Sequence, residues 1–93
     1  MKIVLIDGNK VNTMAKLHAE FIEALEFPEW YGANLDALYD ELTESMGDIG
    51  VIAVNTELLE KNLGGGWKNF LQLMEDVKEE RKGFYFLNDP FGE

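Results

Sequence analysis

Two carboxylates spaced four residues apart, Asp36 and Asp40, could do chemistry together if the segment is helical. Positions i and i+4 lie on one face of a helix, so the pair could divide general acid and base roles, ligate Mg²⁺, or bind a cationic protein surface. The first two roles need another group. We expect no His, Lys or third carboxylate near enough to this pair to divide acid and base roles or to complete a metal shell. The pattern therefore favours binding over catalysis, and we expect a protein that is not an enzyme.

The segment before the acids predicts a loop that runs directly into a helix. Pro28 restricts the residue before it to extended conformations, and Gly32 permits a positive φ, so the chain can turn sharply with Trp30 and Tyr31 at the apex. Asn34 then has the residue type and position of a helix N-cap. We expect this loop and the helix that follows to carry the functional site.

Helical spacing from Asn34 onward separates an apolar stripe from an acidic and aromatic face. The inward stripe is formed by Leu35, Leu38 and Leu42, and the outward face by Asp36, Tyr39, Asp40 and Thr43. Two like charges at i and i+4 repel by roughly 0.2–0.5 kcal/mol on an exposed helix. The first-turn position of Asp36 gains roughly 0.3–1 kcal/mol from the helix dipole, whereas Asp40 has no such local relief. A solvated helix face is the simpler interpretation, and the neighbouring aromatics weigh against it.

Composition and charge restrict the possible partners. The chain has 93 residues with 46% hydrophobic content, which suits one domain over residues 1–93 with a C-terminal tail from about residue 88. A formal charge of -10 makes nucleic acid and anionic membranes poor partners and favours a basic protein. Between Lys16 and Lys61 there are eleven acidic residues and no Lys or Arg. The negative charge is thus concentrated around the predicted site.

The absence of cysteine and the form of the N-terminus bear on cofactors and location. A chain without Cys has no disulfide, thiol nucleophile or cysteine-ligated zinc, and no other residue pattern predicts a metal or cofactor. The apolar run from Ile3 to Ile6 is shorter than a signal-peptide core and ends in Asp7-Gly8, which favours a strand followed by a turn. We expect a cytoplasmic protein without a membrane span.

The periodicity of the remaining chain predicts its other elements. An uninterrupted apolar run of strand length is typical of a strand covered on both faces, so we expect this for Ile3–Ile6. Further strands are expected at Ile49–Val54 and Phe84–Leu87. Helices are expected from the Thr13 cap to about Leu25, after caps offered by Asn55 and Thr56, and from Trp67 to a stop at Gly83. In the last of these helices, Arg81 and Lys82 favour the C-terminal dipole.

The order of strand, two helices, strand, two helices, strand predicts a two-layer α/β domain. Each helical connection is long enough for parallel pairing, so the sheet should be parallel and three-stranded, with packed helices mostly on one face. His18 lies beside an apolar stripe and is interpreted as a packed or hydrogen-bonded group. The run Gly64–Gly66 lacks a Gly-Lys-Ser/Thr ending and a preceding strand, which favours a flexible connector over a phosphate loop.

The segment from Pro28 to Asp40, PEWYGANLDALYD, closely resembles the central motif of the barstar family, intracellular protein inhibitors of barnase-type secreted ribonucleases. The similarity begins near Gly8, continues through Leu17-His18 to Leu42, and returns around Leu71-Gln72 and the final strand. The resemblance implies the three-stranded α/β fold expected above. It also implies that the helix and its preceding loop plug the active-site groove of a basic ribonuclease, with acids standing where RNA phosphates bind.

The resemblance also assigns roles to individual residues. Asp40 would be the principal anchor and Asp36 a second acidic contact, while Trp30 stands in place of a tyrosine that packs on an active-site histidine. Tyr39 replaces a tryptophan, and Thr43 matches a rim contact. The remaining implied contacts are Tyr31, Gly32, Asn34 and the peripheral acid Asp76. We expect a 1:1 complex with a barnase-type nuclease and a monomer when free.

The sequence departs from the family pattern at a few places and leaves alternatives open. A Gly-Trp pair is replaced by Glu44-Ser45, the family's cysteines are missing, and the C-terminal tail is extra. An acidic module for a different basic partner would use the same face without inhibiting a nuclease. A hydrolase would use Asp36 and Asp40 for acid and base chemistry or as Mg²⁺ ligands. A family member that has lost its target is the third alternative.

Overall fold

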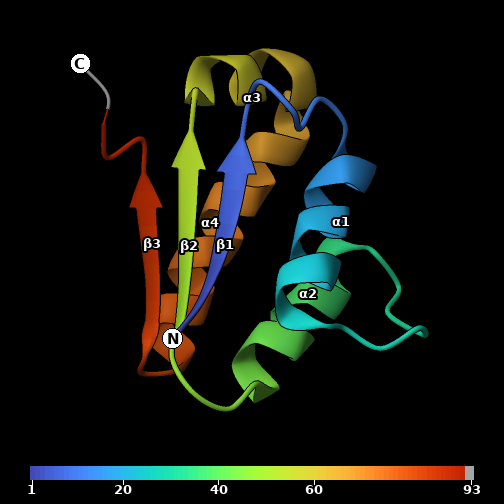
Figure 1. Ribbon diagram of the computed structural model, residues 1–93, viewed down its shortest axis with the longest axis vertical. Coiled ribbons are helices and arrows are strands. Elements are labelled where there is room, and N and C mark those ends of the chain that lie inside the picture. The colour runs from blue at the N-terminus through green and yellow to red at the C-terminus, as the bar shows by residue number, and fades with distance from the viewer. Residues whose placement is uncertain (92–93) are drawn as a thin grey trace.

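The computed structural model describes residues 1–91 and contains seven elements in the predicted order (Figure 1). The strands are β1 (Lys2–Asp7), β2 (Ile49–Val54) and β3 (Phe84–Asn88), and the helices are α1 (Met14–Leu25), α2 (Leu35–Glu44), α3 (Thr56–Leu63) and α4 (Gly65–Glu80). None of the helices within this part of the chain combines the length and apolar character needed to cross a membrane.

The strands form one parallel sheet in the order β1-β2-β3, with β2 in the centre. Val4 pairs with Val51, and Ile49 pairs with Phe84, so side chains of all three strands alternate in step. In Figure 1, α4 lies behind the sheet, α1 and α2 lie beside its β1 edge, and α3 lies at the carboxyl end of the strands. The two-layer α/β fold expected from the order of elements is confirmed.

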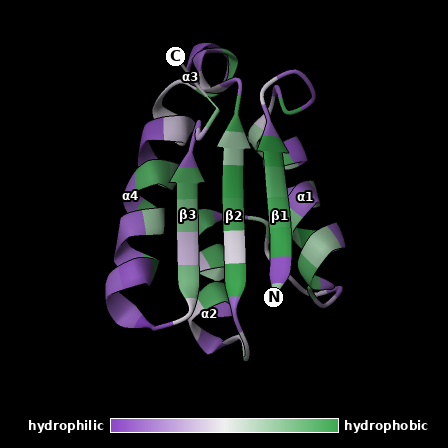
Figure 2. Ribbon diagram, turned by 60° about the vertical axis from the view of Figure 1, so that its left-hand side comes forward, coloured by the Kyte–Doolittle hydropathy of each residue, from purple (hydrophilic) through white to green (hydrophobic). Residues whose placement is uncertain are grey.

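The prediction that β1 is covered on both faces is wrong. Val4 and Ile6 point toward the helices and are fully buried, whereas Ile3 and Leu5 are 48% and 51% exposed. Figure 2 shows the other face of the three strands, where no helix covers the apolar ribbon. A continuous apolar run does not distinguish burial on one face from burial on two, because the second layer depends on where the helical connections pass.

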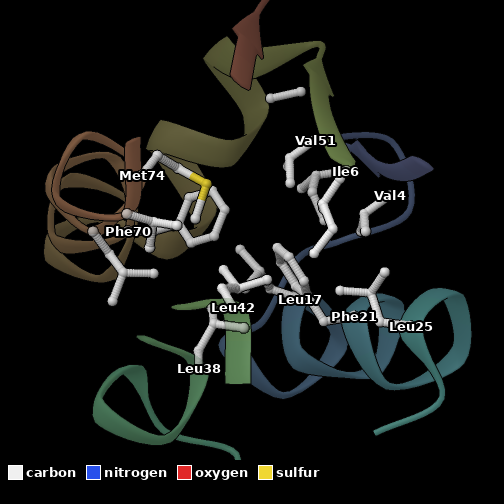
Figure 3. Close-up of a cluster of buried hydrophobic side chains, with 14 of the residues drawn as sticks. Val4, Ile6, Leu17, Phe21, Leu25, Leu38, Leu42, Val51, Phe70 and Met74 are labelled. Atoms are coloured by element: carbon white, nitrogen blue, oxygen red, sulfur yellow. The ribbon is translucent and has the colours of Figure 1, made fainter. Parts of the chain in front are cut away.

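The core lies between the sheet and the helices (Figure 3). Helix α1 contributes Leu17, Phe21 and Leu25, α2 contributes Leu38 and Leu42, α4 contributes Phe70 and Met74, and the sheet contributes Val4, Ile6 and Val51. Burying one such side chain fully is worth roughly 1.5–3 kcal/mol relative to exposure. The apolar stripe of α2 is therefore held against the core, and the opposite face of the helix is fixed in its outward direction.

The glycine run is not a flexible connector. Gly64, at φ 54, ends α3, and α4 begins at Gly65. A Cβ on Gly66 would lie 2.8 Å from the Met14 sulfur, so the absence of a side chain lets the first turn of α4 approach the start of α1. Close packing therefore explains a glycine within a helix that its propensity alone disfavours.

Two smaller expectations are also corrected. Asn55 occupies the N-cap position of α3 but makes no capping bond there, and its side-chain amide instead donates to Asp7 Oδ1 over 2.8 Å. The expected tail begins later than residue 88, because β3 continues through Asn88 and the Asp89 amide donates to the Ala53 carbonyl over 2.7 Å. Residues 92–93 of that tail lie outside the described residues.

Candidate functional site

Helix α2 begins at a well-formed N-cap. The Asn34 backbone is extended at φ -133, and its side-chain oxygen accepts a hydrogen bond from the Ala37 amide over 2.8 Å. This bond satisfies one of the amides that a helix leaves unpaired at its start. Asn34, a candidate contact, thus also fixes the first turn of the helix that carries Asp36.

The two carboxylates lie on the exposed face of α2, as the spacing predicts. Asp36 and Asp40 are both exposed, and neither has an ion pair or side-chain hydrogen bond within residues 1–91. Thr43 is partly buried on this face, and its hydroxyl donates to the Tyr39 carbonyl over 2.8 Å. The face therefore presents two uncompensated negative charges and a hydroxyl oxygen that can still accept a hydrogen bond.

Helix α4 adds negative charge to the same surface. Tyr39 is partly buried between the helices, and this burial is the main cause of its raised pKa. The negative charges of Glu80, Asp76 and Asp40 raise the pKa further. Packing of α4 on α2 thus brings Asp76 near Tyr39, although the two helices are far apart in the sequence. Asp76 also accepts a hydrogen bond from the Gln72 amide over 3.0 Å.

Glu80 was missed by the sequence reasoning. It lies four residues after Asp76, hence on the same face of α4, and that spacing was the available signal. No group of three potential metal ligands is found within residues 1–91.

The loop before α2 presents one aromatic residue and buries part of the other. Trp30 is 83% exposed, whereas Tyr31 turns inward, with its hydroxyl 2.6 Å from His18 Nδ1 and its ring centroid 4.8 Å from that of Phe27. Burial raises the pKa of Tyr31, and the charge of Glu41 adds to this effect. The prediction that both aromatics lie at the apex is thus wrong for Tyr31, whose ring fixes the loop to α1.

His18 is buried, as expected for a packed histidine, and burial lowers its pKa.

The sharp turn of the loop does not lie where the sequence suggested, since Ala33, at φ 48, adopts the left-handed conformation and Gly32 does not. Gly32 is exposed, and its carbonyl accepts a 3.4 Å hydrogen bond from the Asn34 side chain. A Cβ on Gly32 would crowd that amide at 3.1 Å.

Arg81 secures the other end of α2. Its Nη1 donates to the Leu42 carbonyl over 3.1 Å and to the Ser45 carbonyl over 3.0 Å. Helix α2 has no basic residue in its own last turn, so this guanidinium supplies the positive charge that its C-terminal dipole favours. The sequence suggested instead that Arg81 serves the end of α4, because spacing along one helix says nothing about its neighbours.

A two-layer α/β fold that presents two exposed carboxylates on one helix, and an exposed Trp30 in the loop before it, has the construction of a protein-binding domain. The family described as Barstar (barnase inhibitor) matches residues 1–88, and the chain belongs to this family. The chain is also 32% identical over 83 residues to a protein of Bacillus subtilis (strain 168) named "Putative ribonuclease inhibitor YrdF", covering 88% of this chain and 91% of that protein. The family resemblance seen in the sequence is thereby confirmed.

Proposed function

We propose that this protein inhibits a basic ribonuclease of the barnase type by forming a 1:1 complex in which α2 and its preceding loop plug the active-site groove. Membership of the barstar family and similarity to a protein named as a ribonuclease inhibitor support this function. In the complex, the carboxylates of Asp36 and Asp40 would occupy positions that RNA phosphates take in the free enzyme.

The exposed acidic face of α2 carries the proposal. A ribonuclease groove must hold cations to bind phosphate, and a carboxylate forms charge-assisted hydrogen bonds with the same cations without being cleavable. Asp36 and Asp40 have no cationic partner within residues 1–91, and Asp76 and Glu80 extend the negative field toward α4. A cationic groove would relieve the mutual repulsion of these charges, which no group on the described chain does.

The site is also held in place before binding. The Asn34 cap and the buried Leu38 fix the helix, while the hydrogen bond between Tyr31 and His18 fixes the loop that presents Trp30. Ordering a flexible side chain at an interface costs about 0.5–1.5 kcal/mol, and a preorganised surface avoids much of this cost. Such a surface needs no catalytic group of its own, and the proposal includes no enzymatic activity.

Inhibition of RNA cleavage tests the proposal. Barnase should lose its activity as this protein is added, with an end point at one equivalent. Asp40→Asn, which removes a charge but keeps the side-chain shape, should weaken inhibition strongly. Glu57→Gln removes a charge from α3, outside the proposed interface, and should inhibit like the unmodified protein.

The remaining alternatives give different outcomes in the same assay. An acidic module for another partner would leave barnase fully active at every concentration. A hydrolase would itself cleave RNA or a simple phosphodiester, with or without Mg²⁺, and Asp40→Asn would abolish that turnover. Either result would replace the proposed function.

A further inference from the structure

Met46 lies in the loop between α2 and β2, three residues beyond Thr43, and is 93% exposed. It is the most exposed large hydrophobic residue within residues 1–91. A single exposed apolar side chain is ordinary on a protein surface, so exposure by itself assigns no role. The hydrogen bonds of the surrounding loop distinguish Met46 from other exposed residues.

The backbone on both sides of Met46 is held by one side chain. Arg81 donates from Nη1 to the Ser45 carbonyl over 3.0 Å and from Nη2 to the Gly47 carbonyl. Gly47 adopts φ 83, which turns the chain directly after Met46 at no steric cost to a glycine. The side chain of Met46 therefore projects into solvent from a backbone that is already fixed.

The end of the loop is attached to the sheet as well. The Asp48 carbonyl accepts a hydrogen bond from the Lys2 amide over 3.0 Å, and the Asp48 carboxylate packs so closely on Gly83 that a Cβ there would lie 2.5 Å from it. The loop is therefore hydrogen-bonded to Arg81 at the end of α4 and to β1, and it packs on the turn before β3. Folding has already ordered this backbone, so a partner that binds Met46 does not have to supply the free energy for ordering the loop.

Met46 also lies beside the proposed interface. Three residues span at most about 11 Å between Cα atoms, which limits the separation of Met46 from Thr43 at the end of the acidic face. On the other side, Arg81 directly follows Glu80, whose charge acts on Tyr39. The loop that carries Met46 is thus continuous with the acidic surface of α2 and α4.

We propose that Met46 is a further contact with the ribonuclease, packing on an apolar or aromatic side chain at the rim of its basic groove, and that Arg81 is the positioning residue for this contact. The inference rests on the proposed function and adds an uncharged contact to an otherwise acidic interface. The thioether of methionine is flexible and polarisable, and it packs favourably against the edges of aromatic rings. A nuclease that this protein inhibits well would offer such a surface next to its cations.

The test measures Kd with catalytically inactive barnase as the probe. Met46→Ala removes most of the apolar surface that binding would bury and should weaken binding about 10-fold, mainly through faster dissociation. Leu87→Ala is the matched control, because Leu87 is 51% exposed and its register with Ile52 and Leu5 places it on the face of the sheet away from the helices. Its Kd should stay within about 2-fold of that of the unmodified protein.

A second variant separates positioning from simple structural support. Arg81→Lys keeps the charge but loses the planar fork that bonds the Leu42, Ser45 and Gly47 carbonyls at once. If the two residues act together, Met46→Ala should change Kd less when Arg81 has already been replaced by Lys. We expect its effect in the Arg81→Lys protein to be less than about a third of its effect in the unmodified protein. An undiminished effect of Met46→Ala in that background would overturn the role of Arg81.

Failure of this inference can be distinguished from failure of the proposed function. If Asp40→Asn weakens binding and Met46→Ala does not, the function stands and the Met46 contact is overturned. If the unmodified protein does not bind barnase, the proposed function and the inference that rests on it are both overturned.

Discussion

Asp40→Ala should weaken binding without lowering stability, and Leu38→Ala should lower stability with little effect on binding, because the two residues point in opposite directions from α2. Asp40 is exposed without an ion pair within residues 1–91, and it lies one turn from Asp36. Removing its charge relieves a repulsion of roughly 0.2–0.5 kcal/mol. The free energy of unfolding should therefore stay within about 0.5 kcal/mol of that of the unmodified protein, or rise slightly.

Binding should respond to Asp40→Ala far more strongly. If the Asp40 carboxylate is buried against cations of the nuclease, its removal leaves those cations desolvated and unpaired. This costs roughly 2–5 kcal/mol, which corresponds to an increase in Kd of about 30- to 5,000-fold. Most of the change should appear as faster dissociation.

Leu38→Ala provides the opposite case. Leu38 is fully buried, so its truncation should lower the free energy of unfolding by roughly 2–5 kcal/mol through lost burial and a cavity. Binding by the folded fraction should change little. Urea unfolding followed by fluorescence of the buried Trp67, together with inhibition titrations, measures both quantities. An Asp40→Ala protein that unfolds at lower urea but inhibits at full strength would refute the assignment of this helix face to the interface.

Three further predictions concern pH, capping and association rate. Burial lowers the pKa of His18, so at acidic pH the unfolded chain binds more protons than the folded chain, and stability should fall as pH drops below about 6.5. In His18→Gln, the urea midpoint should fall less steeply between pH 7 and pH 5 than in the unmodified protein. An equal slope would exclude His18 as a cause. Asn34→Ala should cost about 0.5–2 kcal/mol of stability and Asn34→Gly only a few tenths, and equal losses in thermal unfolding would contradict the capping role. Association with barnase should slow as salt rises, because opposite charges steer the encounter; stopped-flow rates that do not depend on salt would contradict this.

Local features of the molecule could be predicted from the sequence because they depend on a few neighbouring residues. The cap at Asn34, the buried positions Leu38 and Leu42, and the exposed positions Asp36 and Asp40 follow from helical spacing and the chemistry of helix ends. The parallel sheet followed from the order of elements and the length of the connections. The motif around α2 also carried the family resemblance, which the match over residues 1–88 confirms.

Only the tertiary structure determined which distant groups meet. Periodicity along one helix shows which side is buried but not which neighbour covers it, so the approach of Glu80 to Tyr39 and the bonds from Arg81 to the end of α2 were not predictable from spacing. The inward turn of Tyr31 likewise depends on a hydrogen bond to His18 on another helix. Sequence patterns encode the burial of each position, whereas long-range electrostatic and hydrogen-bond partners are set by how the elements pack.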